Sequence, residues 1–491
     1  MIAAAVLGAG IVFIDGTVVN VALPAIGRSF HSGLATLQWT VTAYTLTLAS
    51  FILVGGSIGD RYGRRRSFVV GVAWFALASL ACGLAPNPTV LILARALQGV
   101  GAALLTPESL AILQATFDQR DRAQAIGIWS GLAGVATAVG PFVGGYLIQA
   151  VSWRLIFLIN LPLVVAVVWI ALRHVPETRD PTVAGRLDVP GAGLATVGLG
   201  ALIYGLIEGT AAGWSSGRVV AALATAVGAA LVFVAVERRT AHPMLPLDIF
   251  RARQFSGANL ATFAVYGALG GALFLIPIQL QQVLGYSPFE AGTALLPVTL
   301  IMLALSPQAG KLSQRIGPRL PMSLGPIVAG GGLAALSRVQ AGTSYTSAFL
   351  PAIVVFALGL ALTVSPLTAT VLGAAPVEHA GLASAVNNAV ARAAGLIAVA
   401  VLPAAAGLTA SSYLHAASFG AGFRTAMWLA GAACAIGGVI AAITIRGGPA
   451  ARAGGEEKVP LSCPLDAPRL CPVEADGRAG GAPDGHPRHR R

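Results

Sequence analysis

The chain has 491 residues, of which 56% are apolar and only 10% are charged, and its formal net charge is +12. Soluble domains carry about 25% charged residues because their surfaces need them, so a mean hydropathy of +0.78 over this length excludes a soluble globular enzyme. The apolar residues form runs of about 20, the length at which a helix crosses a hydrocarbon layer about 30 Å thick. The ~10-residue alternating segments of a membrane barrel are absent from the sequence. The sequence therefore predicts an all-α membrane protein.

Fourteen transmembrane helices are predicted along the chain. Their approximate bounds are 2–26, 37–58, 67–85, 89–112, 125–149, 153–173, 189–209, 217–237, 256–280, 291–310, 320–340, 346–374, 382–409 and 422–446. An even number of spans places both termini on one side of the membrane. With both ends inside, the cytoplasmic segments hold 24 of the 31 Lys and Arg residues and the outer loops hold five.

This distribution fixes the predicted orientation, because the cytoplasmic loops of membrane proteins are enriched in Lys and Arg. Both termini are predicted to be cytoplasmic, in a multi-pass protein of the cell (cytoplasmic) membrane. The net positive charge does not indicate a nucleic-acid partner, because the basic residues follow the membrane topology.

The loop after span two and the loop after span ten repeat one pattern of glycine and arginine. The matched residues are Gly56, Arg61, Gly63 and Arg65 in the first loop and Gly310, Arg315, Gly317 and Arg319 in the second. The matched spans are eight apart, which two six-helix units with two inserted helices explain and a seven-plus-seven division does not. We predict a six-helix half at 1–175, two inserted helices and a cytoplasmic linker at 176–255, and a second six-helix half at 256–446. The tail, 447–491, is rich in Gly and Pro with mixed charges and is predicted to be disordered.

Asp15 lies about midway along span one, ~20 Å above its start at 1.5 Å per residue. Arg95 lies ~10 Å below the outer face in span four, at the same depth of a ~30 Å layer. A carboxylate at the bilayer centre costs about 3 kcal/mol on insertion scales, so it usually has a task and a partner. The pair either ties two helices together or takes part in proton coupling, and its depth favours proton coupling.

The first repeated loop is predicted to be a short cytoplasmic turn. Composition alone favours a solvated basic loop that attracts anionic lipid, but the recurrence favours paired latches that hold the cytoplasmic side closed. The predicted latch residues are Gly56, Asp60, Arg61, Gly63, Arg64, Gly310, Arg315 and Gly317.

Span five contains Gly140-Pro141-x-x-Gly144-Gly145. Small residues four apart let helices approach closely, and Pro141 removes one helix hydrogen bond. General packing would explain the glycines, but the combined pattern is more particular than packing requires.

Arg392 lies ~15 Å into span thirteen, and no acid occurs within any predicted span of the second half. Its guanidinium either reaches a backbone carbonyl or faces a water-filled cavity, and we favour the cavity. The charges expected to matter inside the spans are Asp15, Arg95 and Arg392. The polar residues predicted to line a substrate cavity are Asn20, Gln98, Gln279, Asn387, Asn388 and Arg392.

Together these stretches resemble the major facilitator superfamily, in particular its fourteen-span drug:proton antiporters, over residues 1 to about 446. The first loop is similar to the superfamily's signature loop. The stretch Arg95-x-x-Gln98-Gly99 is similar to a fourth-span motif associated with proton coupling. The span-five pattern is similar to the antiporter motif of exporters. Asp15 to Pro24 and Trp153 to Pro162 resemble stretches typical of the fourteen-span branch. Two departures are that Gln314 stands where the first loop has Asp60, and that the second half lacks the acids of dication exporters.

The resemblance implies proton-coupled efflux of amphipathic drugs or antibiotics by alternating access, with Asp15 exchanging a proton and Arg95 responding to its charge. We expect a neutral or weakly anionic small substrate, protons and membrane lipids as partners of a monomer, and no cofactor, no metal and no enzymatic activity. Neither Lys311 nor Lys458 is followed by Ser or Thr, so the phosphate-binding loop of ATP-driven pumps is absent. Two alternatives are proton-coupled uptake of a small metabolite, against which the span-five pattern argues, and a non-transporting membrane receptor or scaffold. A receptor or scaffold would not need Asp15 and Arg95 at one depth.

Overall fold

The computed structural model describes residues 1–117, 119–179, 189–240, 247–374, 380–409, 412–413 and 415–447. All regular structure in these ranges is helical. The first seven helices are α1 (Ile2–Phe30), α2 (Leu34–Tyr62), α3 (Arg64–Gly83), α4 (Pro88–Thr116), α5 (Gln119–Ala150), α6 (Leu155–Leu158) and α7 (Asn160–His174). Next come α8 (Val189–Ala212), α9 (Gly217–Arg239) and a 3₁₀ turn, Leu247–Arg251. The last are α10 (Arg253–Gln282), α11 (Pro288–Ala294), α12 (Leu296–Ile316), α13 (Arg319–Leu336), α14 (Leu350–Gly373), α15 (Ala380–Ala405) and α17 (Ala416–Thr444).

The helices have the length and hydropathy of membrane spans. Within the described residues, 11 helices are long and apolar enough to cross a membrane, or up to 12 when Leu34–Ile52 and Val54–Tyr62, bent by 49°, count as one span. Each of the fourteen predicted segments overlaps a helix, and the full count of fourteen spans stays a prediction. Most of the tail predicted to be disordered, and parts of the predicted linker, lie outside the described residues.

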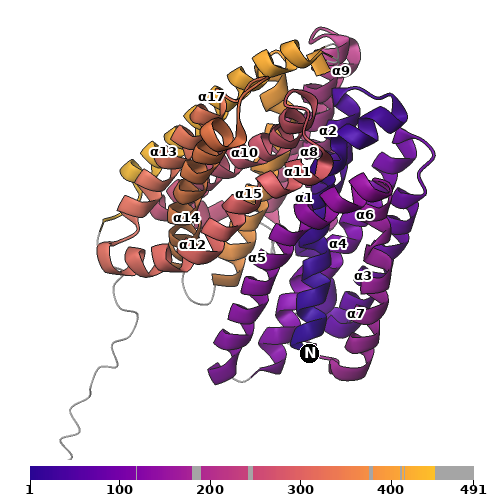
Figure 1. Ribbon diagram of the computed structural model, residues 1–491. Helices are drawn as coiled ribbons and strands as arrows, with labels where there is room; N and C mark the ends of the chain where they lie inside the picture. The colour runs from indigo at the N-terminus through magenta and orange to yellow at the C-terminus, as the bar shows by residue number, and fades with distance from the viewer. Residues whose placement is uncertain are drawn as a thin grey trace, which may run out of the picture. The chain divides into compact units, whose positions relative to one another are not determined.

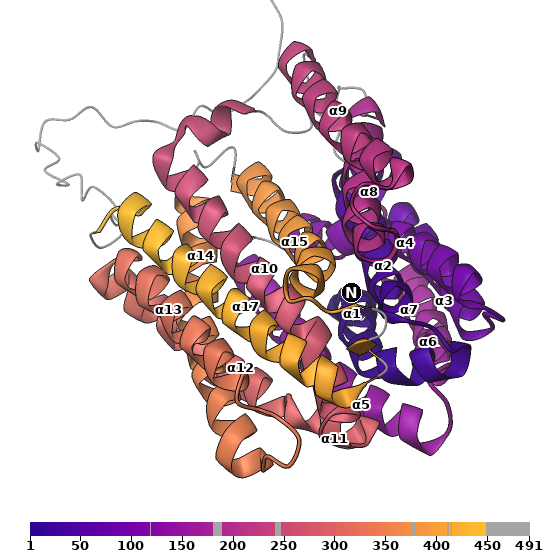
Figure 2. The same ribbon diagram turned by 90° about the horizontal axis from the view of Figure 1, so that it is seen from above.

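Two groups of helices make most of the packing contacts. In the first group α4 packs on α2 and α3, α5 packs on α1, and α7 packs on α3 and α1; in the second, α13 packs on α14 and α17, and α10 packs on α15 and α17. Figures 1 and 2 show α1–α7 side by side in one bundle and α10, α12, α13, α14 and α17 in another. The pair α8 and α9 pack on each other, and α8 also contacts α2 and α15.

Glycine permits the closest helix contacts in both groups. A Cβ on Gly101 of α4 would lie 2.7 Å from the backbone nitrogen of Phe75 of α3, and a Cβ on Gly330 of α13 would lie 2.5 Å from the carbonyl oxygen of Gly431 of α17. In lipid, helix association depends on such close packing because the hydrocarbon supplies no hydrophobic driving force between helices.

The second glycine of each repeated loop has a conformational role. Gly63, between α2 and α3, has φ +115°, and the matched Gly317, between α12 and α13, has φ +88°. Side chains disfavour this half of the Ramachandran map, so glycine lets one helix end and the next begin within two residues at both places.

The two groups meet near one end of the bundle. Gln281 of α10 donates a hydrogen bond to the carbonyl of Val21 of α1 (2.8 Å), and Gln38 of α2 donates one to Val399 of α15 (2.8 Å). Phe142 of α5 packs on Phe289 of α11, with ring centroids 5.2 Å apart. These residues lie toward the end of the bundle at which α1, α5, α10 and α15 terminate and α2 and α11 begin, so this end joins the groups.

Gly145 offers a test of the contact between α5 and α11. A Cβ there would lie 2.5 Å from the carbonyl oxygen of Pro288, and overpacking typically costs about 1–3 kcal/mol. Gly145→Ala should therefore lower the melting temperature of the purified protein by about 2–5 °C, measured by intrinsic fluorescence. The matched change Gly134→Ala on the same helix, where a Cβ meets no heavy atom within 4 Å, should leave it unchanged or slightly higher. Equal melting temperatures for both variants would contradict the close contact.

Candidate functional site

A buried ionic network joins the helices of the first group. The Nη1 atom of Arg95 lies 2.5 Å from Oδ2 of Asp15, and the two side chains are 1% and 0% exposed. Gln98 donates from Nε2 to Oδ1 of Asp15 (2.9 Å), so both carboxylate oxygens have a donor. Arg95 also donates from Nε to the carbonyl of Thr40 (3.1 Å). Because buried charges must be paired and hydrogen-bonded to persist, this is a complete site for an ionised carboxylate.

Further side chains surround Arg95 and extend the network beyond it. Its guanidinium lies over the ring of Tyr44, 4.2 Å from the centroid. Gln98 accepts from Nη1 of Arg95 (2.6 Å) and donates to Oγ of Ser79 (2.7 Å), which also accepts from Asn160 (3.3 Å). Gln98, predicted to line a cavity, is therefore fully buried in this network. The three-residue spacing of Arg95 and Gln98 places both on one face of α4.

The span-five pattern packs between the helix of Asp15 and the second group. A Cβ on Gly140 would lie 3.1 Å from the carbonyl oxygen of Ile14, the residue before Asp15, and one on Gly144 would overlap Val18. On its other side, Pro141 lies against Gly292 of α11, where a Cβ would overlap the Pro141 carbonyl. A shift of α5 or α11 would therefore reach the backbone next to Asp15.

The predicted cytoplasmic turn is held by ionic contacts within the first group. Arg64 binds Asp60 through Nη2 (2.7 Å) and Nε (2.9 Å). The backbone N–H of Arg65 donates to Oε1 of Glu177 (3.1 Å), and the side chains of Arg65 and Arg66 lie 3.7 and 3.9 Å from Oε2 of Glu177. Arg61 is half-buried, and its Nε has no hydrogen-bond partner among the described residues.

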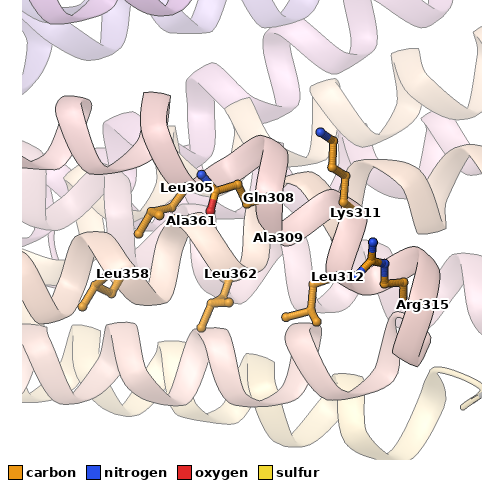
Figure 3. Close-up of a pocket in the computed structure, with 9 residues that line it drawn as sticks. All are labelled: Leu305, Gln308, Ala309, Lys311, Leu312, Arg315, Leu358, Ala361 and Leu362. Atoms are coloured by element: carbon orange, nitrogen blue, oxygen red, sulfur yellow. The ribbon is translucent and has the colours of Figure 1, made fainter.

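The second loop lies beside a separate hollow. Gly310 faces Ser365 of α14, and Lys311 and Arg315 line a cavity of ≈ 470 Å³ between α12 and α14 (Figure 3). Its other lining residues are Leu305, Gln308, Ala309, Leu312, Leu358, Ala361 and Leu362. None of the predicted proton-coupling residues is in this lining, so the cavity is distinct from the Asp15 network.

The remaining predicted cavity residues have varied surroundings. Asn387 of α15 donates to Thr262 (2.8 Å) and Asn259 (3.1 Å) of α10, and Gln279 is buried and donates to Val339 (2.8 Å). Asn388 is exposed and bonds to Ser384 of its own helix. The last two, Asn20 and Arg392, are half-buried, and Oδ1 of Asn20 and Nε of Arg392 have no partner within the described ranges.

Sequence reasoning missed two acids. Glu108, which lies within the predicted span 89–112 and is 0% exposed, was not among the charges singled out inside the spans. Its carboxylate packs against the backbone of Gly59, and neither oxygen has a hydrogen-bond partner in the part of the chain described. An acid inside an apolar run was the available signal. Glu177 gave none, since it lies outside the repeated pattern.

No group of three His, Cys, Asp or Glu residues in the described ranges could hold a metal ion. The buried network places the Asp15 carboxylate next to a guanidinium that has the Thr40 carbonyl and Gln98 as further partners.

A family model described as Major Facilitator Superfamily matches residues 5–400. The chain belongs to the major facilitator superfamily. It is 40% identical over 389 residues to the multidrug resistance protein Stp of Mycobacterium tuberculosis, covering 78% of this chain and 71% of the relative. The tetracenomycin C resistance and export protein of Streptomyces glaucescens is 36% identical over 402 residues, which are 81% of this chain and 74% of that one.

A solved structure shares the fold. A peptide transporter of the POT family in complex with sulfate superposes with a TM-score of 0.64 at 14% identity, covering 89% of this chain and 92% of that chain. The family and the named relatives make this chain a multi-pass membrane transporter of small molecules.

The buried pair gives a stability test. Arg95→Met leaves the Asp15 carboxylate without its counter-charge, and removal of one partner of a buried pair typically costs about 3–5 kcal/mol. The double variant Asp15→Asn/Arg95→Met removes both charges and should melt at a higher temperature than Arg95→Met alone. Thermal unfolding of the purified variants measures this, and a double variant that is less stable than the single one would contradict the pairing.

Proposed function

We propose that this transporter exports amphipathic drugs or antibiotics across the cell membrane in exchange for protons, by alternating access. The name of one relative refers to multidrug resistance and that of the other to resistance and export of tetracenomycin C. The observation that carries the coupling mechanism is the buried contact between Asp15 and Arg95 beside α5. The fold suits this function, since members of this superfamily bind substrate between two repeated bundles that rock against each other.

Proton exchange at Asp15 has a physical switch in Arg95. Desolvation favours the protonated carboxyl and a nearby guanidinium favours the ionised one. When Asp15 takes up a proton, Arg95 loses its counter-charge but keeps the Thr40 carbonyl, Gln98 and the Tyr44 ring. Movement of Arg95 between these partners would therefore alternate proton uptake with release.

The contacts between the groups support an inward-facing state. They gather at the end where α1 terminates, which is the outer end in the proposed topology. The described ion pairs of the turn at Asp60 to Arg66 are made with Asp60 itself and with Glu177, which follows α7, and none of them reaches the second group. In the outward-facing state this turn and its partner at Gly310 to Gly317 would close the cytoplasmic side.

The packing supports the domain organisation that we propose. Two six-helix halves, 1–175 and 256–446, exchange access, and the inserted helices of 176–255 lie against both through the contacts of α8 with α2 and α15. The protein acts as a monomer within the lipid.

Export accounts for the site better than the alternatives. Proton-coupled uptake would not call for the span-five pattern that packs against Ile14 and α11, and the named relatives are resistance proteins. A receptor or scaffold would not need a fully buried ion pair at mid-membrane, which is expensive to maintain.

The charge distribution indicates the class of cargo. Arg392 is the charged residue of α15, and no acid lies within the predicted spans of the second half. A dication would be repelled there and would find no second carboxylate. The cargo is therefore a neutral or weakly anionic amphipathic molecule, held mainly by apolar contact.

Asp15→Asn should abolish export driven by a pH gradient, because the side-chain amide of asparagine does not bind and release a proton as a carboxylate does. The protein should still insert into the membrane and bind substrate. Transport of a radiolabelled antibiotic into inverted vesicles under an imposed pH gradient measures this, with a loss of at least about tenfold expected. The control Asp248→Asn removes an exposed carboxylate and should transport normally. Normal gradient-driven export by Asp15→Asn would overturn the coupling role.

Fourteen spans with both termini inside can be tested with reporters. Alkaline phosphatase fused after Arg446 should be inactive and green fluorescent protein fused there should fluoresce, because this site is cytoplasmic in the proposed topology. Alkaline phosphatase fused after Arg338 should be active, since span eleven ends outside. Phosphatase activity at Arg446 would mean an odd number of spans.

A further inference from the structure

Tyr44 is a buried side chain with an unused hydroxyl. It lies on α2, is 3% exposed, and its ring face carries the guanidinium of Arg95. Its hydroxyl has no hydrogen-bond partner among the described residues. A buried hydroxyl without a hydrogen-bond partner destabilises the protein, so we expect a ligand to bind to this group.

Arg392 lies opposite Tyr44 across the contact between the two groups. Gln38 near the start of α2 bonds to Val399 near the end of α15, so the two helices run in opposite directions where they meet. Tyr44 lies six residues after Gln38 on α2, which is about 9 Å along the helix at 1.5 Å per residue. Arg392 lies seven residues before Val399 on α15, which is about 10 Å along that helix. The two residues are therefore at one level of the contact between α2 and α15.

Arg392 also has unused hydrogen-bonding capacity. Its Nε is buried and has no partner in the described part of the chain. The nearby amides are engaged elsewhere, Asn387 with α10 and Asn388 with its own helix. The Asp15 carboxylate is occupied by Arg95 and Gln98. A buried N–H needs an acceptor, and within the described ranges no carboxylate of the protein supplies one to Nε of Arg392.

We propose that Tyr44 and Arg392 together hold an ionised acidic group of the cargo, such as a carboxylate or a phenolate. The Tyr44 hydroxyl donates to this oxyanion from the first group, and Arg392 donates from the second, in a charge-assisted hydrogen bond. This subsite rests on the proposed export function and specifies its substrate class. Because the ring of Tyr44 also carries Arg95, the same side chain touches the cargo and the proton site.

Two matched substitutions and a matched pair of compounds test this. Tyr44→Phe keeps the ring that carries Arg95 and removes only the hydroxyl, and Arg392→Gln removes the charge. The probes are nalidixic acid, an aromatic carboxylic acid, and its ethyl ester, exported by wild-type and variant protein in proteoliposomes under an imposed pH gradient. Tyr204→Phe is the control, since Tyr204 lies on α8 beside Trp39.

Each substitution should raise the apparent KM for the acid by about tenfold, as expected for one charge-assisted hydrogen bond, and change that for the ester by less than about twofold. The double variant Tyr44→Phe/Arg392→Gln should be much less impaired than the product of the single effects, because both groups bind one oxyanion. Tyr204→Phe should change neither compound.

Three outcomes would overturn the proposal. Tyr44→Phe could match the wild type for the acid, or impair acid and ester by the same factor, as a purely structural role would. The wild type could export the ester and not the acid, which would mean that the protein has no binding site for the ionised group of the cargo. Export of neither compound by the wild type would instead count against the proposed export of amphipathic antibiotics, which separates the two failures.

Discussion

The structure is organised around one buried ion pair between Asp15 and Arg95. Two opposite charges away from water are stable only when the remaining donors and acceptors are also satisfied. That requirement brings five helices together. α1 supplies the carboxylate, α2 the Thr40 carbonyl, and α4 the guanidinium and Gln98. α3 supplies Ser79 and α7 supplies Asn160. In the mechanism that we propose, protonation of Asp15 would change the hydrogen bonds that Arg95 and Gln98 donate to it, and both side chains have partners on other helices of the first group.

Close backbone packing of α5 connects the surroundings of Asp15 with the second group of helices. α5 is packed against α1 at Gly140 and against α11 at Gly145, with little room for a side chain at either place. Tight contacts transmit displacement because packed interfaces resist compression. The helix that approaches Asp15 on one side therefore contacts the second group on the other, and we propose that the glycines of the span-five pattern serve the mechanism as well as the packing.

Much of the fold could be predicted from hydropathy alone, because a helix is the way in which an isolated apolar segment satisfies its backbone in lipid. Each predicted segment overlaps a helix, although several boundaries are displaced and the predicted spans at 153–173 and 291–310 each fall on two shorter helices. The repeat predicted from Gly63 and Gly317 has a physical basis in the positive φ of both residues. Asp15 and Arg95 could be matched from the rise per residue, since depth in a membrane follows from position along a helix.

The site contained more than the sequence revealed. Glu108 was overlooked within its apolar run, and Tyr44 reads in the sequence as one aromatic residue of an apolar helix. Its position between Arg95 and α15 depends on which faces of α2 and α15 meet, and helices with little amphipathicity in a membrane do not encode this. The sequence by itself determined the membrane location, the helices and the depth of the proton-coupling pair, because these follow from hydropathy and rise along one segment. Only the tertiary structure decided the partners of Tyr44, Glu177 and Asn387, because they depend on helix rotation and on contacts between residues far apart in the chain.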